Sequence, residues 1–206
     1  LTNFNLFEIL THIGHSEKVL FVRIFLSVLI LIFSLQSWTK ADDIRDFEIE
    51  GISIGDSLLD YVSEEEIKLE FPYKKKTFGS IVLFDESHKI FDAIQFHVKK
   101  GDKKYKIHSL EGLIFFYENI EDCYPKKEEI VNDVKHLFPD SEIQNRKSNH
   151  YLDKTGKSKV DETIFWINSG ESIRIGCYDW SEEFDYGDKL TVAILDKEIT
   201  KFFMEE

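Results

Sequence analysis

The sequence contains few of the residues that interrupt or cross-link a chain, with three prolines and two cysteines among 206 residues. It lacks an internal repeat, which argues against solenoid and fibrous architectures, and its 14% aromatic content is too high for a disordered protein. Basic residues are the minority, 26 against 39 acidic residues, and the net charge is −13. Because phosphate binding requires clustered Lys and Arg, this charge argues against nucleic acid or an anionic membrane surface as the main partner.

A hydrophobic segment near the start of the chain predicts export. Arg23 supplies a positive charge, Ile24 to Leu35 is an almost unbroken apolar run, and Thr39 and Ala41 are small residues at the −3 and −1 positions of a cleavage site. This is the three-part layout of a secretory signal peptide cleaved after Ala41. The alternative is an uncleaved membrane anchor, but the apolar run is shorter than the roughly 20 residues that span a bilayer.

The signal peptide divides the chain into three parts. Residues 1–21 are expected to be an extended or mis-annotated N-terminus, residues 22–41 the signal peptide, and residues 42–206 a single domain. No cysteine follows Ala41 directly, which argues against a lipid anchor. The expected location is therefore the periplasm, with no stable membrane span after cleavage.

Strand and helix patterns alternate along the mature chain and predict an α+β fold. Extended segments are expected at 47–54, 94–98, 105–107, 113–117, 163–167, 172–177 and 190–194. Helices are expected after Ser57, at 63–69 from a capping-box spacing, at 125–138 and at 198–203. Because turns connect the strands, we expect an antiparallel meander sheet with the helices packed on one face.

Cys123 and Cys177 are expected to form a disulfide, because an even cysteine count in an exported protein favours one. Strand alternation places Cys177 on the same face as Ile173 and Ile175, where the amphipathic helix 125–138 should pack. The alternatives are two buried free thiols or a metal pair that lacks its other ligands.

The segment that follows Cys177 is rich in carboxylates and aromatic rings, and we predict that it is an interaction loop. A solvated acidic turn whose aromatic side chains enter the core is the alternative without a function, and calcium binding is a second alternative. The D-x-[DN]-x-[DN]-G spacing is absent, so no metal ligand is predicted. The candidate loop residues are Tyr178, Asp179, Trp180, Glu182, Glu183, Phe184, Asp185, Tyr186 and Asp188.

Two short motifs imitate catalytic or nucleotide-binding signatures. Gly51 to Gly55 matches G-x-S-x-G, which makes Ser53 a candidate nucleophile, but too little chain precedes it to build a hydrolase sheet. Gly156 to Ser158 matches only the end of a phosphate-binding loop. The histidines lack the spacing of metal ligands, so the sequence predicts no catalytic residue and no cofactor.

Four segments resemble a group of uncharacterised exported proteins from AT-rich marine alphaproteobacteria. They are Phe47 to Leu59, Glu121 to Tyr124, Asp153 to Ser158 and Cys177 to Ser181; this resemblance implies export but no activity. The stretch Ile52 to Ser57 is also similar to the helix entry in outer-membrane assembly lipoproteins and β-lactamase-inhibitor proteins. That second resemblance implies a small fold in which a helix is followed by a meander sheet.

Taken together, these patterns predict a periplasmic interaction or binding module with an envelope protein as its partner. The contact surface is expected to be the sheet face or the loop Tyr178 to Asp188. The alternative function is a small periplasmic serine hydrolase that uses Ser53. A base brought close to Ser53 by the fold would distinguish the two functions.

Overall fold

A computed structural model describes residues 44–85, 87–167, 170–184 and 186–205. The predicted signal peptide, its cleavage site and Asp185 lie outside these residues. Among the helices of the described segments, none has the length and hydrophobicity needed to cross a membrane.

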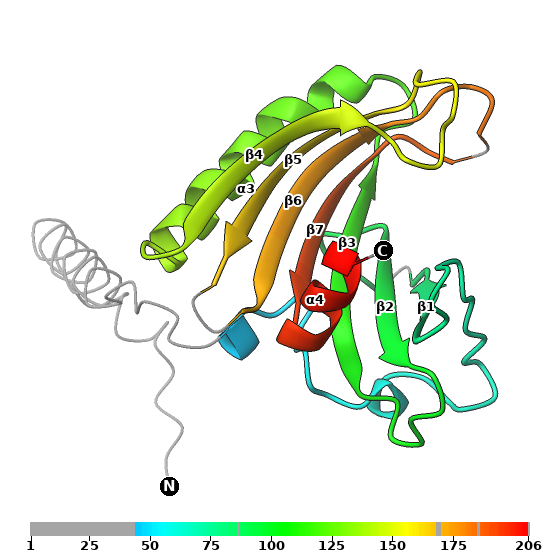
Figure 1. Cartoon of the computed structure of the whole chain (residues 1–206). Helices are drawn as coiled ribbons and strands as arrows, with labels where there is room; N and C mark the ends of the chain where they lie inside the picture. The colour runs from blue at the N-terminus through cyan, green and yellow to red at the C-terminus, as the bar shows by residue number, and fades with distance from the viewer. Residues whose placement is uncertain (1–43, 86, 168–169, 185, 206) are drawn as a thin grey trace, which may run out of the picture. The chain divides into compact units, whose positions relative to one another are not determined.

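The described residues form an antiparallel sheet of seven strands in the order β1-β2-β3-β7-β6-β5-β4 (Figure 1). Two meanders, β1 to β3 and β4 to β7, join through the pairing of β3 with β7, so the α+β class and the antiparallel sheet are confirmed. The strands are β1 (Phe78–Leu83), β2 (Ala93–Lys99), β3 (Ile107–Phe115), β4 (Glu142–Asn149), β5 (Lys159–Trp166), β6 (Ser172–Asp179) and β7 (Lys189–Leu195). The helices are α3 (Cys123–Leu137) and α4 (Lys197–Glu205), and the 3-10 turns are η1 (Ile44–Asp46), η2 (Leu58–Asp60) and η3 (Ile120–Asp122).

Helix α3 packs along the sheet and covers the main core on one face. Its buried residues recur about once per turn, and they face alternate, apolar residues of β6 and β7 such as Ile175 and Val192. The buried helix residues are Cys123, Lys127, Val131 and Val134.

Helix α4 lies on the opposite face from α3, so the expectation that the helices share one face is wrong. On β7, Val192 and Ile194 belong to the core beneath α3, whereas Ala193 and Leu195 pack with Phe202 of α4. Because successive strand residues point to opposite faces, the two helices cover different sides of the sheet. Figure 1 shows α4 in front of the sheet and α3 behind it.

The segment before β1 is less regular than its sequence pattern suggests. The expected strand at 47–54 is a tight turn in which Ile49 bridges Ile52, with positive φ angles at Glu50 and Gly51. The helix expected after Ser57 is only the 3-10 turn η2. At 63–69 the structure has turns instead of a helix, because so short a segment gains too few hydrogen bonds to offset helix nucleation.

Candidate functional site

The face of the sheet opposite α3 is covered by α4 only at one end. On β6, Ile175 points toward α3. Because successive strand residues point to opposite faces, its neighbours Arg174 and Gly176 lie on the face away from α3. We call the part that α4 leaves uncovered the open face. Strand register brings ionisable side chains from four strands together there, and we name these residues the open-face cluster: Glu111, Glu162, Arg174, Tyr178 and Lys189.

The register explains the layout of the cluster. Ala193 of β7 lies between Glu111 on β3 and Arg174 on β6, so a small side chain separates the two long ones. Farther along β7, Lys189 is paired with Phe115 of β3 on one side and with Tyr178 of β6 on the other. The cluster is thus a property of the assembled sheet, and no short segment of the chain contains it.

The two carboxylates of the cluster have different environments. Glu162 is 2% exposed and accepts a hydrogen bond from Arg146 Nη2 at 2.7 Å. Glu111 accepts one from Ser109 Oγ at 3.2 Å. Burial raises the pKa of Glu111 to about 7, and the Ser109 hydrogen bond and the more distant positive charges of the cluster oppose that shift only in part.

His97 is adjacent to Glu111 but does not supply a positive charge. Its Nδ1 lies 3.4 Å from Glu111 Oε1, and Tyr73 hydrogen-bonds its Nε2 at 2.7 Å. Burial lowers the pKa of His97 to about 3, so the imidazole is neutral at physiological pH. Glu111 is therefore buried beside a neutral ring.

Arg174 and Lys189 have no acidic partner within the described residues. The Arg174 guanidinium carbon lies 5.8 Å from the centre of the Phe203 ring, and its Nε is buried without a hydrogen bond to any described residue. Lys189 Nζ lies 5.7 Å from the centre of the Trp180 ring, and burial lowers the pKa of Lys189. Both cations are thus half-buried against aromatic rings, without the carboxylate that usually accompanies a desolvated positive charge.

Tyr178 completes the cluster with a third polar group that lacks a described partner. A Cβ atom added at Gly176 would lie 3.2 Å from the Tyr178 ring, so the absence of a side chain there lets the ring lie flat on β6. Burial, followed by the negative charges of Glu162 and Glu111, raises the pKa of Tyr178. The neutral hydroxyl is available to donate a hydrogen bond.

The loop from Tyr178 to Asp188 borders the cluster and is held by the β4–β5 connection. Asp153 accepts hydrogen bonds from the backbone and hydroxyl of Ser158 at 2.7 and 2.8 Å, and Ser181 N donates to Ser158 Oγ at 3.0 Å. Hydrogen bonds from Thr155 and Ser158 lower the pKa of Asp153. The two connections lie together at one end of the sheet (Figure 1).

The aromatic side chains of the loop pack on one another and do not enter the core. The Trp180 ring centre lies 4.2 Å from that of His150, 5.5 Å from Phe184 and 4.8 Å from Tyr186. Trp180, Phe184 and Tyr186 belong to neither hydrophobic core cluster. Tyr186 is 53% exposed. The loop therefore presents a surface of aromatic rings that contact one another.

This aromatic surface continues beyond the loop. Gly187 lies against the Phe115 ring, which stacks on Tyr117 at 5.6 Å and on Phe84 at 6.3 Å. Phe84 and Tyr117 are 71% and 82% exposed. We name the whole set the aromatic run: Phe84, Phe115, Tyr117, Trp180, Phe184 and Tyr186.

The carboxylates of the loop have separate roles. Asp188 accepts a hydrogen bond from Trp180 N at 2.7 Å, and Glu183 pairs with Lys157. Burial raises the pKa of Asp179, and Glu182 is exposed. Across the described residues, no three His, Cys, Asp or Glu side chains come together as ligands for a metal ion.

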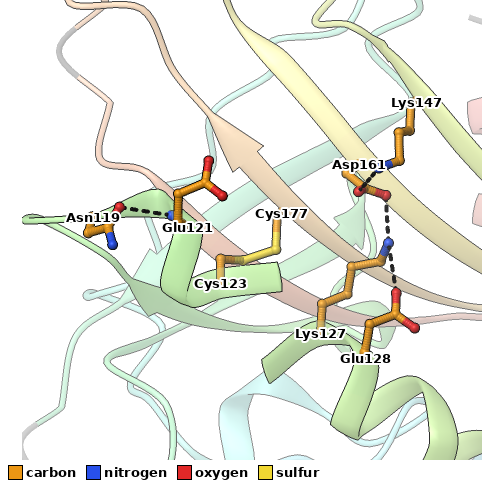
Figure 2. Close-up of a disulfide and its surroundings, with 8 residues drawn as sticks. All are labelled: Asn119, Glu121, Cys123, Lys127, Glu128, Lys147, Asp161 and Cys177. Carbon is orange, nitrogen blue, oxygen red and sulfur yellow. Dashed lines mark hydrogen bonds and ion pairs between the residues drawn. A yellow bond between two sulfur atoms is a disulfide. The ribbon is translucent and has the colours of Figure 1, made fainter. Parts of the chain in front are cut away.

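The Cys123–Cys177 disulfide is confirmed, with the two Cα atoms 6.1 Å apart. It joins the first residue of α3 to β6, directly before the loop (Figure 2). Figure 2 also shows Lys127 of α3 pointing toward Asp161 of β5. Their Nζ and Oδ1 atoms are 2.6 Å apart, so a covalent bond and a buried ion pair both attach the helix to the sheet.

Ser53 has no base among the described residues. Its hydroxyl donates a hydrogen bond to the Arg45 carbonyl oxygen at 3.2 Å, and its amide donates to Asp56. No described histidine exchanges a hydrogen bond with it. The structure therefore gives no activation of Ser53 as a nucleophile.

A shallow hollow lies beside the edge strand β4 and is lined in part by Tyr124, Lys147 and Lys159. Its charged groups have partners. Lys147 pairs with Asp161 at 2.8 Å, and Lys159 donates to Asn149 Oδ1 at 2.7 Å. The open face, where two cations have no such partner among the described residues, is the stronger candidate for a binding site.

A scan against protein-family models, a search of curated proteins and a search of solved structures found no match to this chain. The resemblances noted from the sequence therefore remain predictions.

Proposed function

We propose that this protein is an exported, disulfide-bonded binding module that contacts an envelope protein through the open face and the Tyr178–Asp188 loop. The observation that carries the proposal is the aromatic run, in which Phe84, Tyr117 and Tyr186 are each more than half exposed. Large exposed apolar patches mark interaction sites, and aromatic side chains are frequent anchors of protein interfaces.

The internal packing of the loop supports this function. The backbone amide of Ser181 donates a hydrogen bond to Ser158 Oγ, and the rings of Trp180 and Phe184 contact each other. Because side chains that are already ordered lose little conformational entropy on binding, such a surface can bind a partner without a large ordering cost.

The disulfide fits a protein that folds in an oxidising compartment. We extend this to the periplasm, reached through a signal peptide cleaved after Ala41. N-terminal sequencing of the protein purified from the cell envelope should then begin at Asp42. A sequence that begins before Val22 would contradict this localisation pathway.

The proposed contact surface can be tested by replacing loop aromatics. The full gene product, tagged at its C-terminus and purified after export, is used to capture partners from envelope extract. Trp180→Ala with Phe184→Ala should reduce recovery of the captured partner by about tenfold or more, because each truncation removes a large aromatic contact. Tyr186→Ala removes an exposed ring of the same surface without disturbing a hydrogen bond.

Leu59→Ala is the matched control, because Leu59 is 39% exposed and lies in η2 beside the β2–β3 turn, at the other end of the sheet. It should leave recovery unchanged. A partner retained by both loop variants, or the absence of any captured partner, would contradict the proposal. Circular dichroism of each variant separates loss of contact from loss of fold.

A further inference from the structure

The open-face cluster contains more positive charge than its own carboxylates neutralise by contact. The chain has four arginines, and Arg146 and Arg174 both lie on β-strands that form this face. Arg146 is paired with Glu162, whereas Arg174 has no ion pair within the described residues. A half-buried guanidinium without an acidic partner costs free energy unless a ligand supplies the anion.

The nearby glutamates do not supply that anion. Glu162 is committed to Arg146 at 2.7 Å. Glu111 lies across Ala193 of β7 from Arg174, and Lys189 is four residues from Ala193 on β7. Within the described residues, Glu111 forms no ion pair with either cation. Its oxygen is engaged by Ser109.

We propose that Arg174 binds a carboxylate side chain from a partner protein, in a segment where apolar or aromatic residues flank that carboxylate and which continues along the sheet past Lys189. This inference rests on the proposed function and specifies its partner. The Arg174 guanidinium offers a planar pair of donors that matches a carboxylate. Lys189 lies four residues along β7 from the register position of Arg174 and adds a positive charge nearer the loop. The flanking apolar residues would lie on the aromatic run, which begins at Trp180 beside Lys189.

Two features favour a protein segment with one or two carboxylates. The aromatic run extends from Phe84, at the end of β1, to the β6–β7 loop, which is a surface suited to an extended chain. The net charge of −13 and the exposed Glu182 and Glu183 would repel a long acidic run. The expected motif is therefore an isolated Asp or Glu between apolar residues.

The test uses a random-peptide display library selected on the immobilised protein, purified after export as the full gene product. The enriched peptides should share one Asp or Glu next to apolar or aromatic residues. The tightest peptide is then synthesised with that acid and with the matching amide, Glu→Gln or Asp→Asn. The acidic form should bind roughly tenfold to a hundredfold more tightly, as expected for a hydrogen-bonded ion pair.

Protein variants assign the effect to the two cations. Arg174→Gln should weaken binding of the acidic peptide about tenfold or more and leave binding of the amide peptide unchanged. Lys189→Gln should weaken binding of the acidic peptide by a smaller factor, because its charge acts from farther along the face. Arg174→Lys should retain part of the affinity, because it keeps the charge but loses the planar pair of donors. Lys103→Gln, an exposed residue of the β2–β3 turn, is the control for charge alone.

The outcomes separate this inference from the proposed function. Enriched peptides without an acid, whose binding is lost in Trp180→Ala and kept in Arg174→Gln, would overturn the carboxylate inference and leave the binding surface intact. No enrichment at all would overturn both. Thermal unfolding of Arg174→Gln checks the fold. The variant loses the contact with the Phe203 ring, but it also removes the cost of a half-buried cation without an acidic partner, so its midpoint should stay close to that of the wild type. Lys189→Gln provides the second readout if it does not.

Discussion

Glu111 shows how the open face alters the chemistry of a single side chain. Its carboxyl group is buried beside His97, whose own low pKa keeps the ring uncharged. The cations Arg174 and Lys189 act on it only from a distance. Burial therefore dominates, and the folded protein favours the protonated carboxyl group.

This raised pKa predicts a specific pH dependence of stability. Between the ordinary pKa of a glutamate and the folded value of about 7, the folded state holds a proton that the unfolded state has released. The contribution of Glu111 to the free energy of unfolding should therefore fall as pH rises through this range. Glu111→Gln removes the titrating group and should be more stable than the wild type at pH 8, by on the order of 2–3 kcal/mol.

Urea unfolding of both proteins from pH 4 to pH 8 measures this difference. The advantage of Glu111→Gln should be small at the acidic end of that range and grow with pH. A difference that stays constant with pH would show that Glu111 titrates normally in the folded protein.

At the level of elements, the contact between α3 and the sheet contains a charge that the sequence pattern does not suggest. The pattern predicts an apolar stripe that includes Ile130 and Leu137, which are only partly buried. The buried stripe instead includes Lys127, because Asp161 on β5 supplies its partner at 2.6 Å. A prediction from hydrophobic periodicity assigns every lysine to the surface. The predicted buried face of α3 is therefore rotated slightly from the observed one, which includes Lys127.

The two ends of this ion pair should respond unequally to substitution. Asp161→Asn leaves Lys127, which is 3% exposed, with Glu128 at 3.7 Å as its one remaining acidic neighbour among the described residues, and should cost roughly 3–5 kcal/mol. Lys127→Met keeps the side-chain length and leaves Asp161 paired with Lys147 at 2.8 Å, so it should cost less than about 2 kcal/mol. Guanidinium unfolding at neutral pH gives both values, and equal losses would argue against the asymmetry.

The disulfide at the start of α3 closes a loop between residues 54 positions apart. Its reduction should lower the free energy of unfolding by about 4 kcal/mol in the chain-entropy account. Unfolding with and without reductant measures this loss, with Cys123→Ser plus Cys177→Ser as the genetic equivalent. A loss below about 1 kcal/mol would mean that the helix is held mainly by packing and by the Lys127–Asp161 pair.

The sequence predicts a strand well where at least one face of that strand is buried, and poorly where both faces are exposed. Strands β2, β6 and β7 alternate or run apolar and were predictable. All of β4 is exposed, so its residues carry no apolar alternation, and only pairing with β5 makes it a strand. No sequence pattern near α4 indicates that it packs on the face of the sheet opposite α3. That choice depends on the side of the sheet toward which the chain turns after β7.

Across the whole molecule, the candidate site has two parts that differ in how visible they are in the sequence. The loop from Tyr178 to Asp188 is continuous and unusual in composition, so it could be predicted. The open-face cluster is drawn from β3, β5, β6 and β7, and its members are spread along the sequence. Glu162 and Arg174 interrupt their strands visibly, but only the strand order shows that they share a face.

The most direct test of this account is the NMR signal of the Arg174 Nε–H group, which is buried and has no partner among the described residues. With four arginines in the chain, a 15N-labelled sample gives few such signals, and Arg174→Lys identifies the relevant one. Addition of the acidic display peptide should shift the Arg174 signal in a saturable way, and the amide peptide should not. An Arg174 signal that stays in place while the acidic peptide binds would contradict the account.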